Sequence, residues 1–236
     1  MARWKDSINL WNHLSLKRTL NLVHLYLGYS WSRWTKTPIN SAYPFTLSIE
    51  PTTACNLGCP ECPSGLKQFT RPTGKIDLSV HQKILNDVKG SVFYINYYFQ
   101  GEPFLHPQFL DLIAQAKKEN IYTATSTNAH FIDEPMALKI IDSGLDRLII
   151  SIDGLTQETY EQYRVHGKLN KVLSATQYLI DAKKKRKSST PFLIFQFLAV
   201  RANEHEIPGV FDLGKSFGID EVRIKTAQLY DFENGN

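Results

Sequence analysis

Apolar runs alternate along this chain with longer amphipathic segments. Six short runs, rich in β-branched and aromatic residues and bounded by turn-forming residues, predict β-strands; they cover residues 45–50, 91–99, 121–127, 147–152, 192–200 and 221–226. Between them, helical spacing of apolar residues predicts helices over 79–88, 107–118, 134–143, 156–163, 169–185 and 206–217. This alternation predicts an α/β fold of parallel strands joined by helical crossovers. Six strands suit either an open doubly wound sheet or an incomplete barrel.

Residues that commonly end helices follow several of the predicted helices. Gly90, Asn120, Gly144 and Gly218 each come shortly after such a segment, where a residue able to adopt the left-handed conformation is favoured. The five consecutive basic residues at 183–187 are expected to end a helix, where cations oppose the negative end of its dipole. We prefer this interpretation to nucleic-acid binding, so no nucleic-acid partner is expected.

A further helical pattern covers residues 7–34, before the first strand. Its candidate apolar positions are Leu10, Leu14, Leu20, Val23 and Leu27. Tryptophans and basic residues give the segment a character that would suit a membrane surface or a partner. We favour packing against the main domain, because amphipathic helices of globular proteins have the same pattern. The expected organisation is an N-terminal helical extension, 1–44, followed by a core domain, 45–236.

Composition describes an ordinary globular chain of 236 residues, with 42% hydrophobic and 21% charged residues. That length predicts one domain with a short appendage. The net charge of +4 is mildly basic, and the basic residues are scattered enough to indicate a normal surface. The first residues lack the apolar core and cleavage site of a signal peptide. No segment has the length and purity of a membrane-spanning helix.

The three cysteines of the chain, Cys55, Cys59 and Cys62, lie in one loop, C-N-L-G-C-P-E-C, directly after the first predicted strand. Three soft thiolates this close together can hold a metal centre, but they leave it one ligand short of a closed four-thiolate site. Structural metal sites are usually closed, whereas a vacant coordination position allows substrate chemistry. The loop therefore predicts a reactive metal centre. Cysteines used in this way need a reducing compartment, so a cytoplasmic location is expected.

Other interpretations of the cysteines fit less well. A structural zinc site needs a fourth ligand, and the nearest downstream histidine, His106, lacks a paired C-x2-C or H-x3-H motif. We interpret His106 as an ordinary loop residue. A disulfide framework would leave one thiol over, and a chain of this size can bury a core without disulfides. Zinc remains the alternative to an iron–sulfur centre.

Further polar motifs lie at the carboxyl ends of the next three predicted strands. They are Q-G-E-P at 100–103, T-S-T-N at 125–128 and S-I-D-G at 151–154. In parallel α/β folds, functional residues gather at the carboxyl ends of the strands, whether the sheet is open or closed. Within the cysteine loop, Gly58 permits close approach of the backbone and Pro60 fixes the turn. We therefore expect these motifs and the cysteine loop to share one edge of the sheet.

The spacing C-x3-C-x2-C, without a fourth cysteine, resembles the signature of the radical S-adenosylmethionine (SAM) enzymes. In that family the loop carries a [4Fe-4S] cluster whose fourth iron binds SAM, and the loop follows the first strand of a (β/α)6 partial TIM barrel. The resemblance covers residues 45–226. It implies this partial barrel, preceded by the N-terminal helical extension, with the cluster on Cys55, Cys59 and Cys62.

The same resemblance implies SAM contacts for the other motifs. Residues 100–103 are similar to the family's G-G-E-P element, with Gln100 in place of the first glycine. This implies that Gly101 and Glu102 receive the SAM ammonium group through charge-assisted hydrogen bonds. Asn128 belongs to a segment similar to the family's T-N-G, which lines the same pocket or caps the next helix. Glu61 replaces the aromatic residue that often precedes the last cysteine, and its backbone is expected to contact adenine.

The segment from Ser151 to Arg164 resembles the S-x-D-G…Y-x-x-x-R element of the peptide and cofactor maturases in this family. It implies that Ser151 bonds the ribose or carboxylate region of SAM, and that Arg164 reaches the methionyl carboxylate with its planar fork. Asp153 is expected either to cap the following helix or to act as a direct ligand. Gln196 and Lys225 have two interpretations: they face the lumen and contact SAM or substrate, or they belong to plain strand surface. We favour the second.

The resemblance implies an enzyme that cleaves SAM reductively and generates a 5′-deoxyadenosyl radical for hydrogen abstraction. The substrate is not identified, and peptides and small molecules are both candidates; an electron donor such as flavodoxin or ferredoxin is implied. The details are closest to the SPASM-type branch, but no cysteine follows Cys62, so a minimal core or a truncated SAM-binding fragment is expected. A non-catalytic iron–sulfur or zinc-binding module is the alternative.

Overall fold

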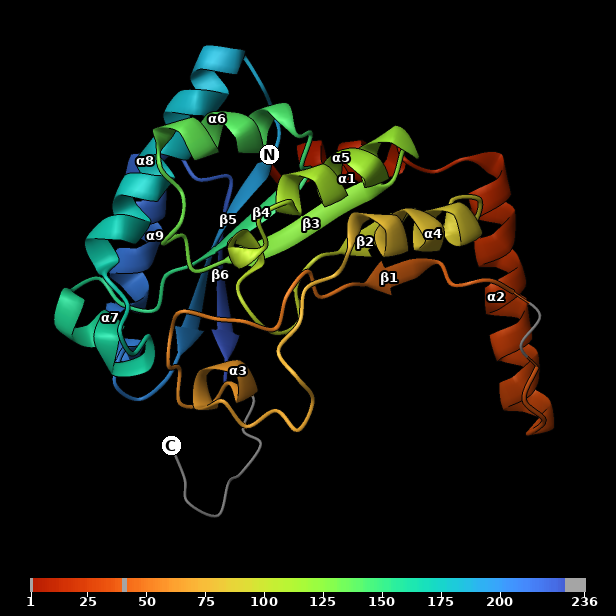
Figure 1. Ribbon diagram of the computed structural model, residues 1–236, viewed down its shortest axis with the longest axis horizontal. Helices are drawn as coiled ribbons and strands as arrows, with labels where there is room; N and C mark the ends of the chain where they lie inside the picture. Colours follow the sequence, from red (N-terminus) through yellow and green to blue (C-terminus); the bar gives the residue numbers. More distant parts are fainter. Residues whose placement is uncertain (1, 40–41, 228–236) are drawn as a thin grey trace.

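Six parallel strands form the centre of the computed structural model, which describes residues 2–39 and 42–227 (Figure 1). They are β1 (Thr46–Ser48), β2 (Tyr94–Asn96), β3 (Tyr122–Thr127), β4 (Arg147–Ser151), β5 (Phe192–Ala199) and β6 (Glu221–Thr226). The strands lie in chain order, and each pair of neighbours is parallel. With β1 and β6 at its two edges, the sheet forms the predicted (β/α)6 partial barrel.

The first two strands are shorter than predicted, with three residues each. The predicted strands covered residues 45–50 and 91–99. Backbone hydrogen bonds continue beyond the short strands, since Phe93 N donates to Phe45 O and Ile49 N donates to Asn96 O. The shortening therefore reflects the irregular backbone at the ends of these strands and leaves their pairing intact.

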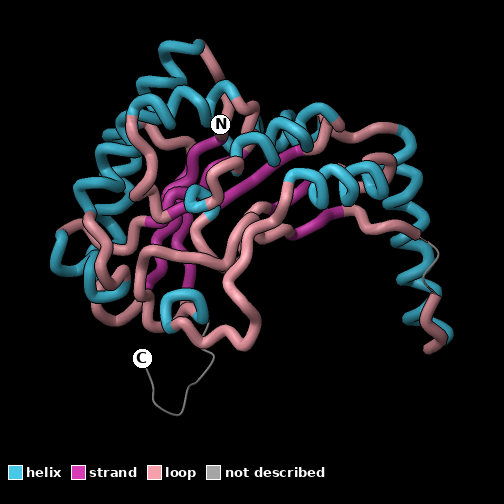
Figure 2. Tube along the Cα trace, viewed as in Figure 1, coloured by secondary structure: helices cyan, strands magenta, loops and turns pink. Residues whose placement is uncertain are grey.

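Helices connect successive strands and lie on the outer side of the curved sheet (Figures 1 and 2). They are α4 (Leu78–Val88), α5 (Phe109–Lys118), α6 (Glu134–Asp142), α7 (Gln157–Tyr163), α8 (Leu169–Arg186) and α9 (Ile207–Phe217). A short helix, α3 (Pro63–Leu66), follows the cysteine loop, and two 3-10 turns occur at η1 (Pro103–Leu105) and η2 (Glu204–Glu206). The order of these elements agrees with the predicted alternation.

Most of the predicted helix-ending residues have the expected conformation. Asn120, Gly144 and Gly218 have φ values of 51°, 78° and 75°, which is the left-handed region. Gly90 does not, because α4 ends at Val88 and its C-cap, Lys89, has a right-handed conformation. The basic run ends α8 as predicted, with Lys187 as its left-handed cap.

The two faces of the sheet have different surroundings. On β4, Leu148 and Ile150 join the large core shared with the helices, whereas Ile149 belongs to a small second cluster with Phe192 and Ile194. Successive side chains of a strand point to opposite faces, so the second cluster lies on the inner face of the barrel. Toward the carboxyl ends of the strands this inner face becomes polar.

The N-terminal segment forms two helices, so the prediction of one helix over residues 7–34 is wrong. They are α1 (Ala2–Trp11) and α2 (Leu16–Thr35). Ser15 separates them as the N-cap of α2, and its hydroxyl accepts a hydrogen bond from Arg18 N at 3.3 Å. A serine in this extended conformation satisfies one of the free N–H groups of the new helix and favours a fresh start. None of the helices in the described ranges is both long enough and apolar enough to span a bilayer.

Helix α1 packs at the amino ends of β3 and β4. Its Asp6 is buried, accepts a hydrogen bond from the Tyr122 hydroxyl and forms an ion pair with Arg147. Asn9 Nδ2 donates to Asp146 Oδ1 at 2.9 Å. Tyr122 and Arg147 are the first residues of their strands. Helix α1 therefore covers the end of the sheet opposite to the cysteine loop.

Helix α2 is attached to the rest of the molecule at its start. Arg18, its buried residue, donates hydrogen bonds from its guanidinium to the carbonyls of His13, Lys89, Glu119 and Asn120, over 2.6 to 3.0 Å. Three of these carbonyls lie at the carboxyl ends of α4 and α5. Farther along, α2 extends away from the sheet (Figure 1), and most of its apolar side chains are exposed. The prediction that this segment packs against the main domain is thus confirmed for α1 and the start of α2, but it is wrong for the rest of α2.

Candidate functional site

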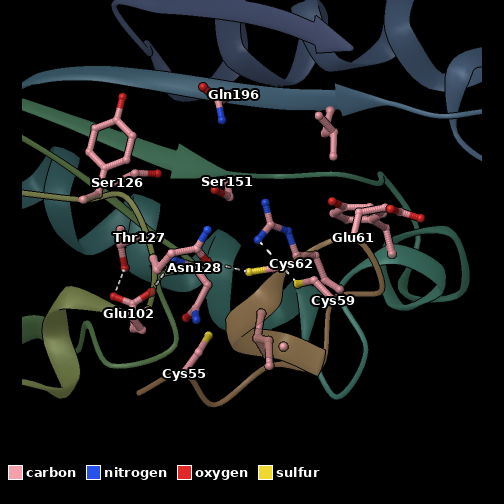
Figure 3. Close-up of a pocket in the computed structure, with 18 of the residues that line it drawn as sticks. Cys55, Cys59, Glu61, Cys62, Glu102, Ser126, Thr127, Asn128, Ser151 and Gln196 are labelled. Atoms are coloured by element: carbon pink, nitrogen blue, oxygen red, sulfur yellow. Dashed lines mark hydrogen bonds between the residues drawn. The ribbon is translucent and has the colours of Figure 1, made fainter. Parts of the chain in front are cut away.

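A cavity of about 760 Å³ lies at the carboxyl ends of the strands (Figure 3). Its volume is in the range of small-molecule binding sites. The lining includes all nine residues predicted for the cluster and SAM: Cys55, Cys59, Glu61, Cys62, Gly101, Glu102, Asn128, Ser151 and Arg164. Residues from four separate segments of the sequence therefore meet at one place. Their individual binding roles remain predictions.

The cysteine loop is held by short backbone contacts on both sides. Cys62 N donates to Cys59 O at 3.2 Å, and Gly58 N donates to Val165 O at 3.0 Å. Helix α3 begins directly after Cys62 and packs closely on the loop, because a Cβ added at Gly65 would lie 2.6 Å from the backbone of Cys59. Sequence reasoning did not single out Gly65, whose importance depends on this close contact.

The three cysteines are free thiols. Burial raises the pKa of the Cys55 thiol to about 11. Burial also raises the pKa of Cys59, although the nearby charge of Arg164 opposes it. Because metals and iron–sulfur clusters bind thiolates, a metal centre here must displace protons from Cys55 and Cys59 as it binds.

The arrangement of donors fits a [4Fe-4S] cluster. Within the described part of the chain, no group of three or more His, Cys, Asp or Glu side chains surrounds one point as a single-ion site would. A cubane cluster does not need such a point, since each thiolate binds a different iron. His106, the zinc-ligand candidate nearest in sequence, is buried and donates from Nε2 to Ile76 O at 2.8 Å, and its Nδ1 accepts from Gln108 N at 3.1 Å. Both of its ring nitrogens are thus occupied within the protein.

Gln100 contacts the cysteine loop directly. Its Oε1 accepts hydrogen bonds from Ser64 Oγ at 3.1 Å and from Cys62 Sγ at 3.4 Å. In the sequence, Gln100 was only a departure from the G-G-E-P pattern. The structure shows that its side chain links the loop after β2 to α3, beside one of the cysteines.

Gly101 occupies a position that only glycine fits. Its φ is +79°, and an added Cβ would lie 2.2 Å from Thr52 O. Its backbone N–H donates to Ser64 Oγ at 3.0 Å. The tight turn places Gly101 and the next residue, Glu102, in the cavity lining.

Glu102 joins the loops that follow β2 and β3. Its buried carboxylate accepts hydrogen bonds from Thr127 Oγ1 and Asn128 N, both at 2.7 Å, and from Phe104 N at 3.2 Å. Burial raises the pKa of Glu102 to about 7, although these three hydrogen bonds lower it. The carboxyl group therefore changes its charge near neutral pH while it lines the cavity.

Asn128 connects the end of β3 to the cysteine loop. Its Nδ2 donates to Asn56 Oδ1 at 2.8 Å, and its Oδ1 accepts from His130 N at 3.1 Å. The expectation that it caps the next helix is wrong, because Asp133 is the N-cap of α6. Asn128 instead stabilises a local turn and contacts the loop that carries the cysteines.

Asp153 acts behind the cavity wall. The prediction that it caps α7 is wrong, because the N-cap is Thr156. Asp153 also lies outside the residues that line the cavity. Its Oδ2 accepts from Arg164 Nε at 2.5 Å, and its Oδ1 accepts from Leu198 N at 2.6 Å. Asp153 is thus a positioning residue that fixes Arg164 and the end of β5.

Arg164 places a positive charge beside the cysteines. Its guanidinium NH1 donates to Cys59 Sγ at 3.7 Å. Burial lowers its pKa, but the negative charges of Asp153 and Cys59 outweigh burial and raise it well above the usual value. The guanidinium therefore remains charged at the cavity wall.

The inner face of β4, β5 and β6 adds residues that the sequence interpretation assigned elsewhere. Gln196 and Lys225 line the cavity, so their assignment to plain strand surface is wrong. Gln196 pairs in register with Ser151 (Figure 3). The available signal was that Gln196 is the single polar residue of β5, FLIFQFLA. Tyr98 and Phe99 also belong to the lining and had not been singled out, whereas Ser126 belongs to the predicted T-S-T-N motif.

Comparison with known proteins gives a family and several relatives. Residues 49–197 match the radical SAM superfamily. PqqA peptide cyclase from Gluconobacter oxydans is 26% identical over 187 residues, which cover 79% of this chain and 50% of the relative. Mycofactocin maturase MftC from Mycobacterium ulcerans is 31% identical over 140 residues, 59% of this chain and 37% of the relative. The chain thus spans about half, or less, of the length of these relatives.

Among solved structures, SuiB from Streptococcus suis bound to S-adenosylmethionine has a TM-score of 0.67 and 16% sequence identity. The similarity covers 82% of this chain and 43% of SuiB. A second structure of SuiB contains its precursor peptide SuiA. At this identity the likeness shows the fold, which is the partial barrel described above.

Proposed function

Because this chain belongs to the radical SAM superfamily, we propose that its cavity binds a [4Fe-4S] cluster and SAM, and that the protein modifies a peptide by radical chemistry. One observation supports this most strongly. The three cysteines and six SAM-contact residues, predicted from separate segments, line a single cavity. Three protein thiolates leave one iron of a cubane for a non-protein ligand.

When bound, the cluster and SAM supply the reductive cleavage that generates a 5′-deoxyadenosyl radical. The protein's own residues bind and orient the cofactor. The carboxylate of Glu102 and the guanidinium of Arg164 line the same cavity. A negative and a positive group suit the ammonium and carboxylate groups at the methionine end of SAM. Asp153 holds the guanidinium in place from behind.

For the remainder of SAM, we propose contacts with Ser151, Asn128 and the backbone at Glu61. Ser151 lies on the inner face of β4, and Asn128 is tied to the cysteine loop through Asn56. Gln196, which neighbours Ser151 on β5, and Lys225 on β6 add polar groups to the same cavity lining. We also propose that the fold divides at about residue 44 into an N-terminal extension and the core domain.

A peptide is the substrate class that the comparisons support. The relatives include a peptide cyclase and a maturase, and SuiB was solved with a precursor peptide. These relatives also agree with the SPASM-type branch of the family. Strong one-electron reduction is needed, so we propose flavodoxin or ferredoxin as the electron donor. Such a donor and free thiol ligands belong to the reducing cytoplasm.

Anaerobic reconstitution tests this function. The protein is expected to take up four irons per chain, and after dithionite reduction to convert SAM into 5′-deoxyadenosine and methionine. Cys59→Ala should lose the cluster, because it removes one of three ligands, whereas Ser143→Ala, remote from the cavity lining, should not. Tight binding of one zinc per chain, or iron without SAM cleavage, would instead support the non-catalytic module.

A further inference from the structure

Helix α2 exposes a continuous row of apolar side chains. We call this row the apolar stripe; it consists of Leu16, Leu20, Val23, Leu27, Trp31 and Trp34. Residues three or four positions apart share one face of a helix, so these six lie on the same side. Their exposed fractions range from 48% at Val23 to 77% at Trp34. A large exposed apolar row of this kind usually marks an interaction surface.

Helix α1 repeats the pattern on a smaller scale. Trp4, Ile8 and Trp11 follow the same spacing and are 75%, 56% and 68% exposed. The side of α1 that carries Asp6 is the one attached to the sheet. All four tryptophans of the chain are therefore in α1 and α2, and all are exposed.

The positive charge of the chain is concentrated in the same segment. Residues 1–44 contain six of the 27 basic residues but only one of the 23 acidic residues, which gives a net charge of +5. The rest of the chain, with 21 basic and 22 acidic residues, has a net charge of −1. The one acidic residue, Asp6, is paired with Arg147 of the core. Residues 1–44 thus account for the net positive charge of the chain, and the same segment carries the exposed aromatic and aliphatic side chains.

We propose that α2, together with the exposed side of α1, docks on an anionic lipid membrane surface. The apolar stripe would lie at the level of the acyl-chain boundary, and the exposed basic residues, Lys5, Lys17, Arg33 and Lys36, would contact lipid phosphates. Tryptophan is suited to this interface because it is amphipathic. An apolar groove on another protein would accommodate the stripe, but it would not account for the positive charge of the segment. Charge complementarity therefore favours the lipid surface.

The attachment of the segment is compatible with this docking. Asp6 and Arg18 fix α1 and the start of α2 to the amino ends of β3 and β4 and to the carboxyl ends of α4 and α5. The cavity opens at the opposite ends of the strands. Binding of the segment to a membrane therefore leaves the cavity accessible to cofactor and substrate.

Intrinsic tryptophan fluorescence of the full chain tests the proposal, because it reports on this segment alone. Vesicles of phosphatidylcholine mixed with phosphatidylglycerol should shift the emission to shorter wavelength and should carry the protein down on sedimentation. Vesicles of pure phosphatidylcholine, or high salt, should weaken both effects, because the basic residues lose their attraction.

A pair of matched variants locates the contact. Leu20→Glu with Leu27→Glu should lower binding to the anionic vesicles at least about tenfold, because it places two charges in the stripe. Val80→Glu with Phe211→Glu makes the same change at two exposed apolar residues of α4 and α9 and should bind as the unmodified protein does. Circular dichroism checks that both variants fold.

Three results would overturn the proposal. The first is an unchanged emission spectrum with no sedimentation on anionic vesicles. The second is equal vesicle binding by the stripe variant and the unmodified protein. The third is that the protein does not bind lipid and has twice the mass of the monomer in solution, whereas the stripe variant is monomeric. This result would assign the stripe to a second copy of the chain.

Discussion

Glu102 is a single residue on which the electrostatics of the cavity depends. Burial raises its pKa to about 7, so the carboxyl is neutral at acidic pH and charged only above about 7. If it binds the SAM ammonium group, the affinity for SAM should rise as the pH is raised toward and through this value. Calorimetric titration of SAM into the reconstituted protein measures this. Glu102→Gln should bind about tenfold more weakly at neutral pH and should lack the rise.

The same shift has a consequence for stability. The pKa is higher in the folded protein than in an unfolded chain, so the folded state holds this proton more tightly. Protonated Glu102 therefore stabilises the folded state. This stabilisation is fully present below the normal glutamate pKa and is lost as the pH rises through about 7. A pH-independent SAM affinity in the unmodified protein would contradict the assigned role of Glu102.

At the residue scale, most of the side chains that surround the cavity could be predicted from the sequence. Their hydrogen-bond and ion-pair partners were harder to predict. The cysteines, Gly101 and Arg164 follow strand ends in recognisable motifs, and the structure places them together. The partnership of Asp153 with Leu198 joins segments that are distant in sequence. Such contacts depend on packing, which no local motif encodes. The position of Gln196 could have been predicted, because it is the single polar residue in the apolar strand β5. Strand alternation puts it on the same face as Phe192 and Ile194.

Among the connections between elements, the Asp153–Arg164 ion pair joins the loop after β4 to the end of α7. Both side chains are mostly buried. Asp153→Ala leaves the guanidinium without its partner and should lower the free energy of unfolding by about 3 kcal/mol. SAM affinity should fall as well, because Arg164 loses its fixed orientation. Chemical denaturation and calorimetry measure the two effects.

Asp142→Ala provides the matched control. Asp142 pairs with Arg186 across an exposed surface, with side chains about half exposed, where ion pairs contribute little. This variant should change the free energy of unfolding by less than about 1 kcal/mol and leave SAM binding intact. Equal effects of the two substitutions would refute the positioning role of Asp153.

Arg18 has a comparable role at the other end of the sheet. Its guanidinium satisfies four backbone carbonyls, three of them at helix carboxyl ends. Arg18→Met should lower the free energy of unfolding by about 3 kcal/mol, because these carbonyls lose charged donors. Arg33→Met, on the exposed part of α2, should have almost no effect. Denaturant unfolding of both variants decides whether α2 is anchored through Arg18.

The break between α1 and α2 shows why the elements were only partly predictable. Apolar residues continue at helical spacing on both sides of Ser15, and no acidic residue follows at the position that would complete a capping box. Periodicity therefore extended one helix through the break. The long α/β elements, by contrast, had both periodicity and end signals, and most of their bounds agree with the structure.

For the whole molecule, the strand and helix alternation was enough to predict a parallel α/β fold. It did not distinguish an open sheet from a partial barrel, because curvature depends on strand stagger and twist. The family resemblance made that choice, and the structure and the comparisons confirm it. The charge asymmetry between residues 1–44 and the remainder was present in the sequence, but its significance emerged only when α2 was found to be exposed.

The central claim is that SAM binds the iron that the three cysteines leave without a protein ligand. The most direct measurement is the electron paramagnetic resonance spectrum of the dithionite-reduced, reconstituted protein with and without SAM. We predict a [4Fe-4S] signal whose g values change when SAM is added, because a new ligand reaches the cluster. A cluster signal that stays the same at saturating SAM would contradict the account.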